Sequence, residues 1–290
     1  MKTQVLVTGA EGFIGRALVQ ALESAGCEVW RVDVTARCSE RAVAVNLLDA
    51  AATNAALGRI PPCAAVVHLA ALAHGQAPPA GETCFSTNCK ITENLIAAVA
   101  DWKAQFVFFS SIAVYGEDGR EGPVPPLAPL RPATEYGHSK QVCEERILAQ
   151  PWPNIDIVRL APVFTRERLT DVRKRVFLPA LPFRWRMSPS PEHSLCSLET
   201  VVQAVVTRVR RGPRGRTLAN IGDPKPYLQT DLLTWFTGPV LPLPLAPTRL
   251  GYLLFKLVPG GLGYELRSLY WKLFRSNTYS LAEVTLPSPR

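Results

Sequence analysis

The stretch QVLVTGAEGFIGRALVQAL, residues 4–22, decides the fold of this protein. It begins as an apolar strand, passes through Gly9, Gly12 and Gly15, and continues as an apolar helix. Glycines between a strand and a helix leave free backbone N–H groups at the positive end of the helix dipole. Gly9 permits the sharp turn, Gly12 lets a pyrophosphate approach the backbone, and Gly15 lets the helix pack on the sheet. The alternative is a tight turn that binds nothing.

The next strand ends in a carboxylate that favours a bound dinucleotide. Asp33 closes the strand EVWRVD, residues 28–33. At this distance from the glycines, a carboxylate can accept hydrogen bonds from an adenosine ribose, and it repels a 2′-phosphate. We therefore predict NAD as the cofactor. Arg31 and Arg37 stand near Asp33 in the sequence, so NADP remains an alternative.

Composition and length limit the classes of protein that fit this chain. The 290 residues are 47% hydrophobic, which suits one large domain or two small ones with a sizeable core. The seven cysteines form no CxxC pair and there are four histidines, so we predict neither a metal site nor a disulfide framework. Residues 1–8 already have the pattern of a strand, so we expect no signal peptide and a cytoplasmic protein.

Positive charge is concentrated in one stretch of the chain. The net charge is +8, and residues 166–186 hold seven basic and two acidic side chains, which is five of those eight charges. Such a cluster suits phosphate or an anionic surface, and a solvated helix face is the alternative. We expect no nucleic acid, because no aromatic residues alternate with the cations and no DNA-binding motif is present. The basic residues are Arg166, Arg168, Arg173, Lys174, Arg175, Arg184 and Arg186.

Strands and helices alternate along the first half of the chain. This pattern predicts an α/β protein with a Rossmann-type doubly wound parallel sheet. We expect an NAD-binding domain over residues 1–160 and a smaller C-terminal substrate-binding region over 161–290, partly interwoven with the first. The expected strands are 4–9, 28–33, 42–47, 64–70, 105–111 and 155–161, and the expected long helices are 14–25, 86–102 and 135–149. Proline-rich connectors cover 123–132 and 239–247.

A second group of polar residues follows the expected strand 105–111. In EYGHSK, Tyr136 and Lys140 are four residues apart, so both side chains leave one face of a helix. A tyrosine of ordinary pKa, about 10, is a poor base at neutral pH, but a nearby ammonium and a positively charged nicotinamide favour its phenolate. Ser110 and Ser111 end the strand at the rim where doubly wound sheets bind ligands. A Tyr–Lys pair alone occurs by chance in many helices.

With these motifs in order, the sequence resembles the extended short-chain dehydrogenases/reductases, and among them the nucleotide-sugar epimerases and reductases. The resemblance covers about residues 1–235. It rests on TGAEGFIG, Asp33, VNLLD, HLAA, STNCKITENLIAA, SSIAVYG and YGHSK. Two positions depart from the family: His193 stands where arginine is common, and Glu199 stands where aspartate is common.

The resemblance implies a role for each matching residue. Tyr136 is the implied catalytic acid/base, Lys140 lowers its pKa and holds the nicotinamide ribose, and Ser111 binds the reacting sugar oxygen. Asn88 supports the active-site strand, and we interpret His68 as structural. The implied cofactor-binding residues are Gly9, Glu11, Gly12, Phe13, Ile14, Gly15, Asp33, Asp49 near the adenine, Leu69, Ala70, Ala71, Asn88, Tyr136 and Lys140.

Three reactions occur on this scaffold in the family. A 4,6-dehydratase needs a pair of acid/base residues directly after the hydroxyl residue, where this chain has Ile112 and Ala113. An epimerase and a 4-ketoreductase both need Tyr136, Lys140 and Ser111. Because Asp33 favours NAD, we favour a 4-epimerase over a reductase using NAD(P)H. A non-catalytic NAD-binding sensor is the less favoured third class, since it has no use for all three residues.

A nucleotide-sugar substrate brings a second diphosphate that needs its own cations. At helical spacing Arg166 and Arg173 share one face and Arg168 and Arg175 share another, so we expect one pair to face the substrate. We take Arg166 and Arg173 as the substrate-binding pair. Alternatively, this stretch and the basic, apolar C-terminal tail contact an anionic membrane. We also expect a homodimer. The cations of the tail are Arg249, Lys256, Arg267, Lys272 and Arg275.

Overall fold

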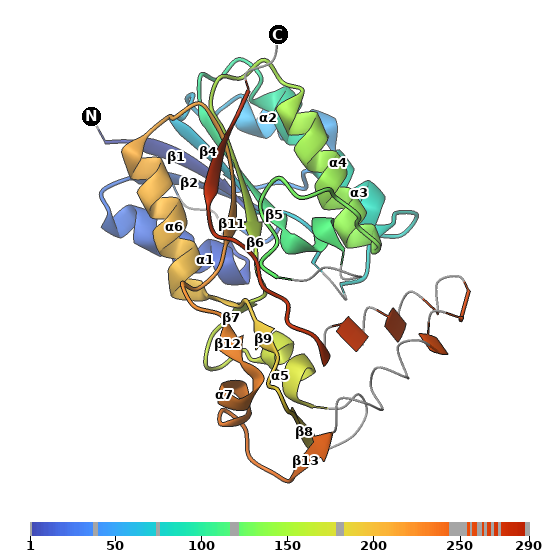
Figure 1. Cartoon of the computed structure of the whole chain (residues 1–290). Coiled ribbons are helices and arrows are strands. Elements are labelled where there is room, and N and C mark those ends of the chain that lie inside the picture. Colours follow the sequence, from blue (N-terminus) through green and yellow to red (C-terminus); the bar gives the residue numbers. More distant parts are fainter. Residues whose placement is uncertain are drawn as a thin grey trace.

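The fold is built on one large sheet (Figure 1). The computed structural model describes residues 2–36, 40–73, 76–116, 122–177, 183–243 and 274–287, with short pieces between 254 and 271. Eight strands lie in the order β14–β11–β6–β5–β4–β1–β2–β3, and β14 alone is antiparallel to its neighbour. The strands are β1 Gln4–Thr8, β2 Glu28–Asp33, β3 Ala42–Ala44, β4 Ala65–His68, β5 Gln105–Ser111, β6 Ile155–Leu160, β11 Arg216–Ile221 and β14 Glu283–Leu286.

Helices cover both faces of this sheet, as the predicted doubly wound fold requires. Helices α1 (Phe13–Ser24) and α6 (Leu198–Arg211) lie on one face (Figure 1). The other face carries α2 (Ala50–Leu57), α3 (Cys84–Ala98) and α4 (Glu135–Leu148). The prediction of an α/β fold with a doubly wound sheet is therefore confirmed.

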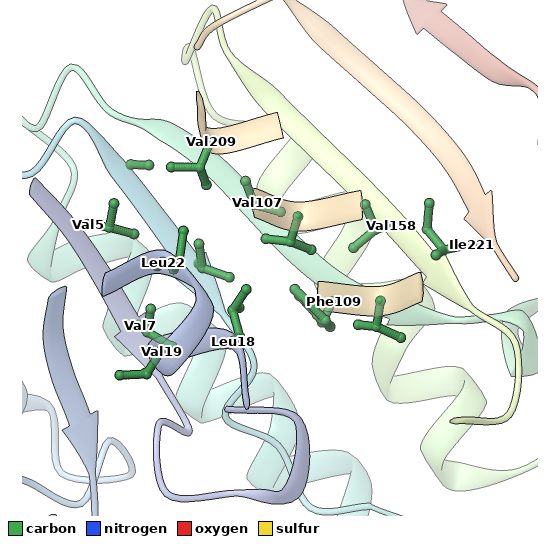
Figure 2. Close-up of a cluster of buried hydrophobic side chains, with 14 of the residues drawn as sticks. Val5, Val7, Leu18, Val19, Leu22, Val107, Phe109, Val158, Val209 and Ile221 are labelled. Carbon is green, nitrogen blue, oxygen red and sulfur yellow. The ribbon is translucent and has the colours of Figure 1, made fainter. Parts of the chain in front are cut away.

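The two cores follow from the alternation of side chains along the strands. Val5 and Val7 point toward α1 and α6, whereas Leu6 between them points toward the opposite face. Figure 2 shows the first cluster, where Leu18 and Leu22 of α1 meet the valines of the sheet. Strands buried on both faces have near-continuous apolar sequences, which explains why these strands stand out in the sequence.

The sheet extends beyond the first 160 residues. Strand β11 pairs in parallel with β6, and β14 near the end of the chain pairs with β11 in the opposite direction. Helix α6 packs beside α1 on the same face. The C-terminal half therefore contributes two strands and one helix to the large layer, and only its remaining elements form the smaller region.

The smaller region lies beyond the carboxyl end of β6 (Figure 1). It has its own apolar cluster, which includes Phe164, Val172, Val176, Leu195 and Leu232. No helix in the described parts of the chain is long and apolar enough to cross a membrane. The elements are β7 Val163–Phe164, α5 Thr170–Val176, β8 Arg184–Met187, β9 Glu192–His193, β10 Cys196–Ser197, β12 Tyr227–Leu228, α7 Gln229–Leu233 and β13 Val240–Leu243.

Candidate active site

The glycine loop lies at the point where the order of the strands reverses. This point falls between β1 and β4, and ligands of doubly wound sheets bind outside the carboxyl ends of such strands. Gly9 has a φ of +68°, and a Cβ there would lie 2.8 Å from the backbone nitrogen of Ala70. A Cβ on Gly15 would overlap the carbonyl oxygen of Gly9. Both glycines are therefore required by the close packing of the loop itself.

The start of α1 fits a pyrophosphate. Gly12 is the N-cap residue, and no side chain caps the helix there. The N–H groups of the first turn of a helix have no partner within the helix and carry the positive end of its dipole. The uncapped start of α1 therefore offers the phosphate cradle that a dinucleotide needs. NAD would bind here, with the backbone of residues 12–15 holding its phosphates.

Asp33 is fixed beside the glycine loop. One oxygen of its carboxylate accepts the Glu11 N–H at 3.1 Å, and the other accepts the N–H and hydroxyl of Thr35 at 3.0 and 2.9 Å. Arg31 instead pairs with Glu23 of α1 at 2.6 Å. Arg37 lies outside the described residues. The described arginine near Asp33 is thus turned toward α1, which supports the preference for NAD.

Five further predicted cofactor residues lie in three different settings. Ile14, Leu69 and Ala71 line the same cavity as the expected catalytic residues. Ala70 donates its N–H to the Thr8 hydroxyl at 3.2 Å. Asp49 is the N-cap of α2, where its carboxylate accepts the Ala52 N–H at 2.9 Å, and its predicted contact with adenine is untested.

Asn88 and His68 connect elements behind the site. The Asn88 side chain accepts the Leu72 N–H at 2.7 Å and donates to the Leu72 carbonyl and the Ser139 hydroxyl at 3.2 and 3.0 Å. His68 is buried, and its two ring nitrogens are hydrogen-bonded to Thr8 and Thr92 at 2.7 and 3.1 Å. Burial and the charge of Lys140 lower the pKa of His68 to about 3. The described contacts of both side chains are with the framework of the protein, as we expected for His68, and the predicted contact of Asn88 with the cofactor is untested.

Ser111, Tyr136 and Lys140 line one cavity of about 430 Å³. Ser111 ends β5, and its hydroxyl is hydrogen-bonded to the Tyr136 phenol. Lys140 donates to the carbonyl oxygen of Phe109 at 2.8 Å, and its Nζ lies 5.8 Å from the centre of the Tyr136 ring. A Cβ on Gly137 would lie 2.7 Å from the Ala113 carbonyl oxygen, so glycine there lets α4 approach the end of β5 closely.

Burial strengthens the preference of this group for its protonated tyrosine. It raises the pKa of Tyr136 to about 12, while the hydrogen bond from Ser111 acts in the opposite direction. Tyr136 is therefore a phenol at neutral pH, ready to donate a proton. Burial lowers the pKa of Lys140, and Cys143, Glu144 and Cys84 act to raise it.

The cations that line the cavity are not the predicted pair. Arg168, Lys174 and Arg175 line it, and Arg166 and Arg173 do not. The Arg173 guanidinium instead lies over the Phe177 ring, 3.8 Å from its centre. The prediction from helical spacing is wrong because α5 begins only at Thr170, so Arg166 and Arg168 lie before the helix. The structure thus brings the alternative pair, Arg168 and Arg175, to the cavity lining, where the Arg168 guanidinium lies over the Phe13 ring, 4.5 Å from its centre.

One wall of the cavity comes from residues that the sequence did not point to. Ser194, Asn277 and Tyr279 line it, although the last two lie far along the chain. Ser194 donates its N–H to the Asn277 carbonyl at 2.8 Å, and its hydroxyl accepts the Tyr279 N–H at 3.1 Å. His193 beside them is fully buried, and burial, together with the charge of Arg175, lowers its pKa. No local motif marks these residues, because long-range pairing places them.

A larger groove of about 670 Å³ lies elsewhere, beside α6 and β14. Its lining includes Gln203, Arg208, Arg211, Arg214 and Glu283, and none of the predicted catalytic or glycine-loop residues. We therefore place the site in the smaller cavity, where the motifs meet.

Comparison with known proteins gives the family of this chain. The sequence pattern of the NAD-dependent epimerase/dehydratase family matches residues 5–158. A curated relative, the 4-hydroxy-2-methyl-3-oxo-4-farnesyl-3,4-dihydroquinoline-1-oxide ketoreductase of Stigmatella aurantiaca, is 27% identical over 230 residues. The match covers 73% of this chain and 66% of the relative, just under two thirds of its length.

Solved structures share the fold at low identity. A short-chain dehydrogenase/reductase superfamily protein from Agrobacterium tumefaciens with bound NAD has a TM-score of 0.66 at 23% identity, covering 83% of this chain and 86% of that one. UDP-glucose 4-epimerase from Thermus thermophilus in complex with NAD has a TM-score of 0.65 at 21% identity, and the match covers 93% of this chain and 99% of that one. WbmG from Bordetella bronchiseptica in complex with NAD and UDP has a TM-score of 0.66 at 19% identity, and the match covers 90% of this chain and 82% of that one.

The family pattern extends over more than half of the chain and includes the glycine loop and the Tyr136–Lys140 pair. The predicted family resemblance and NAD cofactor are thereby confirmed at the level of the family. This protein belongs to the NAD-dependent epimerase/dehydratase family.

Proposed function

We propose that this protein is a nucleotide-sugar 4-epimerase that transiently oxidises the C4 hydroxyl of the sugar. The observation that supports the proposal is the meeting of Ser111, Tyr136 and Lys140 in one cavity, whose lining also includes Arg168, Lys174 and Arg175. A hydroxyl–phenol–ammonium group suits proton exchange with an alcohol or ketone oxygen. The cations suit the diphosphate of the substrate.

Each residue has a distinct task in this proposal. Ser111 holds the reacting oxygen, and Tyr136 removes its proton during oxidation and returns it during reduction. NAD, when bound, supplies the acceptor and donor of the hydride. Removal of a proton requires the Tyr136 phenolate, which the Lys140 ammonium and the positive charge of the oxidised nicotinamide favour. The phenol that burial favours in this structure is the form that returns the proton.

The carboxylates near the site do not favour dehydration. Asp171 is the one carboxylate among the described residues that line the cavity, and it accepts a hydrogen bond from Lys174 at 2.8 Å. An elimination requires a free acid/base group in addition to the tyrosine, and Ile112 and Ala113 cannot supply one. We therefore keep the proposal to hydride transfer at one carbon.

The second candidate is a ketoreductase that consumes NADH or NADPH. The curated relative is named a ketoreductase, and the three catalytic residues serve a single reduction equally well. UDP-glucose carrying deuterium at C4 separates the candidates. An epimerase converts it to the C4 epimer, returns deuterium to the same carbon and causes no net change in NADH. A reductase leaves UDP-glucose unchanged and oxidises NADH when a 4-keto sugar nucleotide is supplied. Failure of both reactions, with NAD bound, would favour a sensor.

Asp33→Ala is expected to weaken NAD binding by about tenfold and NADP binding much less, because it removes a ribose acceptor and a charge that repels the 2′-phosphate. Fluorescence titration of both cofactors measures the change. Asp101→Ala, at an exposed turn after α3, is the matched control. Wild-type protein that binds NADP as tightly as NAD would contradict the assignment and favour the reductase.

Arg168→Ala and Arg175→Ala are expected to raise the KM for the sugar nucleotide by about tenfold each, since each removes a charged hydrogen-bond donor from the cavity. NAD affinity should stay unchanged in Arg175→Ala, whereas the Arg168 guanidinium also lies over the ring of Phe13 in the glycine loop, 4.5 Å from its centre. Arg166→Ala and Arg173→Ala serve as controls from the same stretch and should leave KM near the wild-type value. Initial rates over a range of substrate concentrations test this. An unchanged KM in all four variants would contradict the pocket assignment.

The membrane alternative makes a different prediction for the same variants. If residues 166–186 contact an anionic membrane, the arginine variants lose salt-sensitive binding to vesicles of anionic lipid and keep their KM. Of the tail cations, Arg249, Lys256 and Lys272 lie outside the described residues. We further propose that the protein works as a cytoplasmic homodimer, which sedimentation equilibrium tests.

A further inference from the structure

A buried ion pair lies directly behind the catalytic residues. The Arg159 guanidinium of β6 donates from Nε and Nη2 to the two carboxylate oxygens of Glu144 in α4, at 2.9 and 2.5 Å. Both side chains are almost completely buried, with 5% and 3% of their surface exposed. Charges are seldom taken so far out of water unless a partner and further hydrogen bonds compensate them. The pair therefore needs an explanation beyond packing.

Glu144 joins the two elements that carry the catalytic residues. It stands one helical turn after Lys140 on the same face of α4, and its Oε1 also accepts the hydroxyl of Ser110. Ser110 is the neighbour of Ser111 at the end of β5, and Lys140 donates to the Phe109 carbonyl of the same strand. Two links one turn apart thus fix α4 against the end of β5.

Arg159 extends the connection to the far wall of the cavity. Its Nη1 donates to the Tyr115 hydroxyl at 2.9 Å, and that hydroxyl donates to Asn220 at 2.6 Å. Asn220 of β11 donates in turn to the Ser280 carbonyl at 3.0 Å, next to Tyr279, which lines the cavity. One chain of hydrogen bonds therefore runs from α4 to the C-terminal segment.

We propose that Glu144 is a positioning residue, which, held by Arg159 and Ser110, fixes Lys140 against β5 and keeps its ammonium group charged. This inference rests on the proposed function of Lys140 beside Tyr136. Burial lowers the pKa of Lys140, and Cys143, Glu144 and Cys84 oppose this effect, with Glu144 as the carboxylate among them. The other titratable groups that face Lys140 are Tyr136 and Cys143 of α4, Cys84 of α3 and His68 of β4. Of these, Cys143 has a pKa lowered to about 7, chiefly by its hydrogen bond with Cys89, so its thiolate is a second negative charge that favours the Lys140 ammonium group.

The charge of Lys140 can be measured without substrate. Lysine labelled with carbon-13 at Cε reports the titration of each ammonium group in the NAD-bound protein, and Lys140→Arg identifies the Lys140 signal. In Glu144→Gln we expect the pKa of Lys140 to fall by about one unit or more, because a nearby negative charge is lost and Arg159 remains. In Arg159→Gln we expect the pKa of Lys140 to rise, because the Glu144 carboxylate is no longer neutralised by a guanidinium. Glu145→Gln, the exposed neighbour on α4, should leave it unchanged.

Shifts of opposite sign separate this role from a structural one. Loss of either partner of a buried ion pair destabilises a protein, so both variants should melt at lower temperature whatever the role of Glu144. If a single variant does not fold, Glu144→Gln/Arg159→Gln removes both charges together, and the two shifts oppose each other, so the pKa of Lys140 should lie above its value in Glu144→Gln and below its value in Arg159→Gln. An unchanged pKa of Lys140 in Glu144→Gln, shifts of the same sign in the two single variants, or a double variant with the same pKa as the single variant that folds, would overturn the inference. Absence of turnover would count against the proposed function and leave this measurement valid.

Discussion

Tyr136→Phe is expected to lower turnover by about 10²–10⁴-fold, the usual effect of removing a positioned acid/base group. The phenol oxygen is the only part of the side chain that is lost, and it is the partner of Ser111. The ring remains to fill the same space, so NAD affinity and the melting temperature should stay close to the wild-type values. Single-turnover rates with the deuterated sugar nucleotide, together with NAD titration, measure these quantities.

Tyr227→Phe provides a matched control for the loss of a phenol. Its hydroxyl donates to Asp223 at 2.6 Å in the smaller region, and it is not part of the cavity lining. We expect this variant to keep wild-type turnover. A Tyr136→Phe enzyme that retains more than half of its activity would exclude the acid/base role. A wild-type protein that binds NAD but converts no sugar nucleotide would favour the alternative of a non-catalytic NAD-binding sensor.

Gly15→Ala is expected to lower the free energy of unfolding by about 3 kcal/mol, the upper part of the usual range for overpacking. The new Cβ would overlap the Gly9 carbonyl oxygen and lie 2.9 Å from the carbonyl carbon of Ala10. Both neighbours are backbone atoms of the glycine loop, so relief requires the loop to move. We therefore also expect a large loss of NAD affinity. Urea unfolding and NAD titration check the two effects.

Gly26→Ala is the control for this substitution. Gly26 has a φ of +85° after α1, and a Cβ there meets nothing within 4 Å. Only the left-handed backbone opposes alanine, which costs about 1–2 kcal/mol. If Gly15→Ala is no less stable than Gly26→Ala and binds NAD normally, the loop does not have the close packing described.

The first half of the fold follows from local patterns in the sequence. Strands buried on both faces appear as short apolar runs, and helices carry apolar residues at helical spacing, because backbone geometry fixes both periods. The predicted helix at 135–149 is observed at Glu135–Leu148, and the predicted strand at 105–111 is observed at those residues. Tyr136 and Lys140 share a helix face for the same local reason.

The substrate side of the cavity depends on contacts that no local pattern contains. The sequence suggested Arg166 and Arg173, but a helix that begins at Thr170 brings Arg168 and Arg175 to the lining instead. Where a helix begins within a basic stretch is decided by what packs against it, here the small apolar cluster that contains Val172 and Val176.

The sequence by itself determined the parallel sheet, the glycine loop, Asp33 and the Ser111–Tyr136–Lys140 group, because each depends on spacing along one strand, turn or helix. The tertiary structure alone decided that β14 closes the sheet antiparallel to β11, and that Asn277 and Tyr279 reach the cavity. It also decided that Glu144, fifteen residues before Arg159, meets it inside the protein. Such pairings depend on the packing of segments that are distant along the chain, and the hydrophobic period of each segment does not specify its partner.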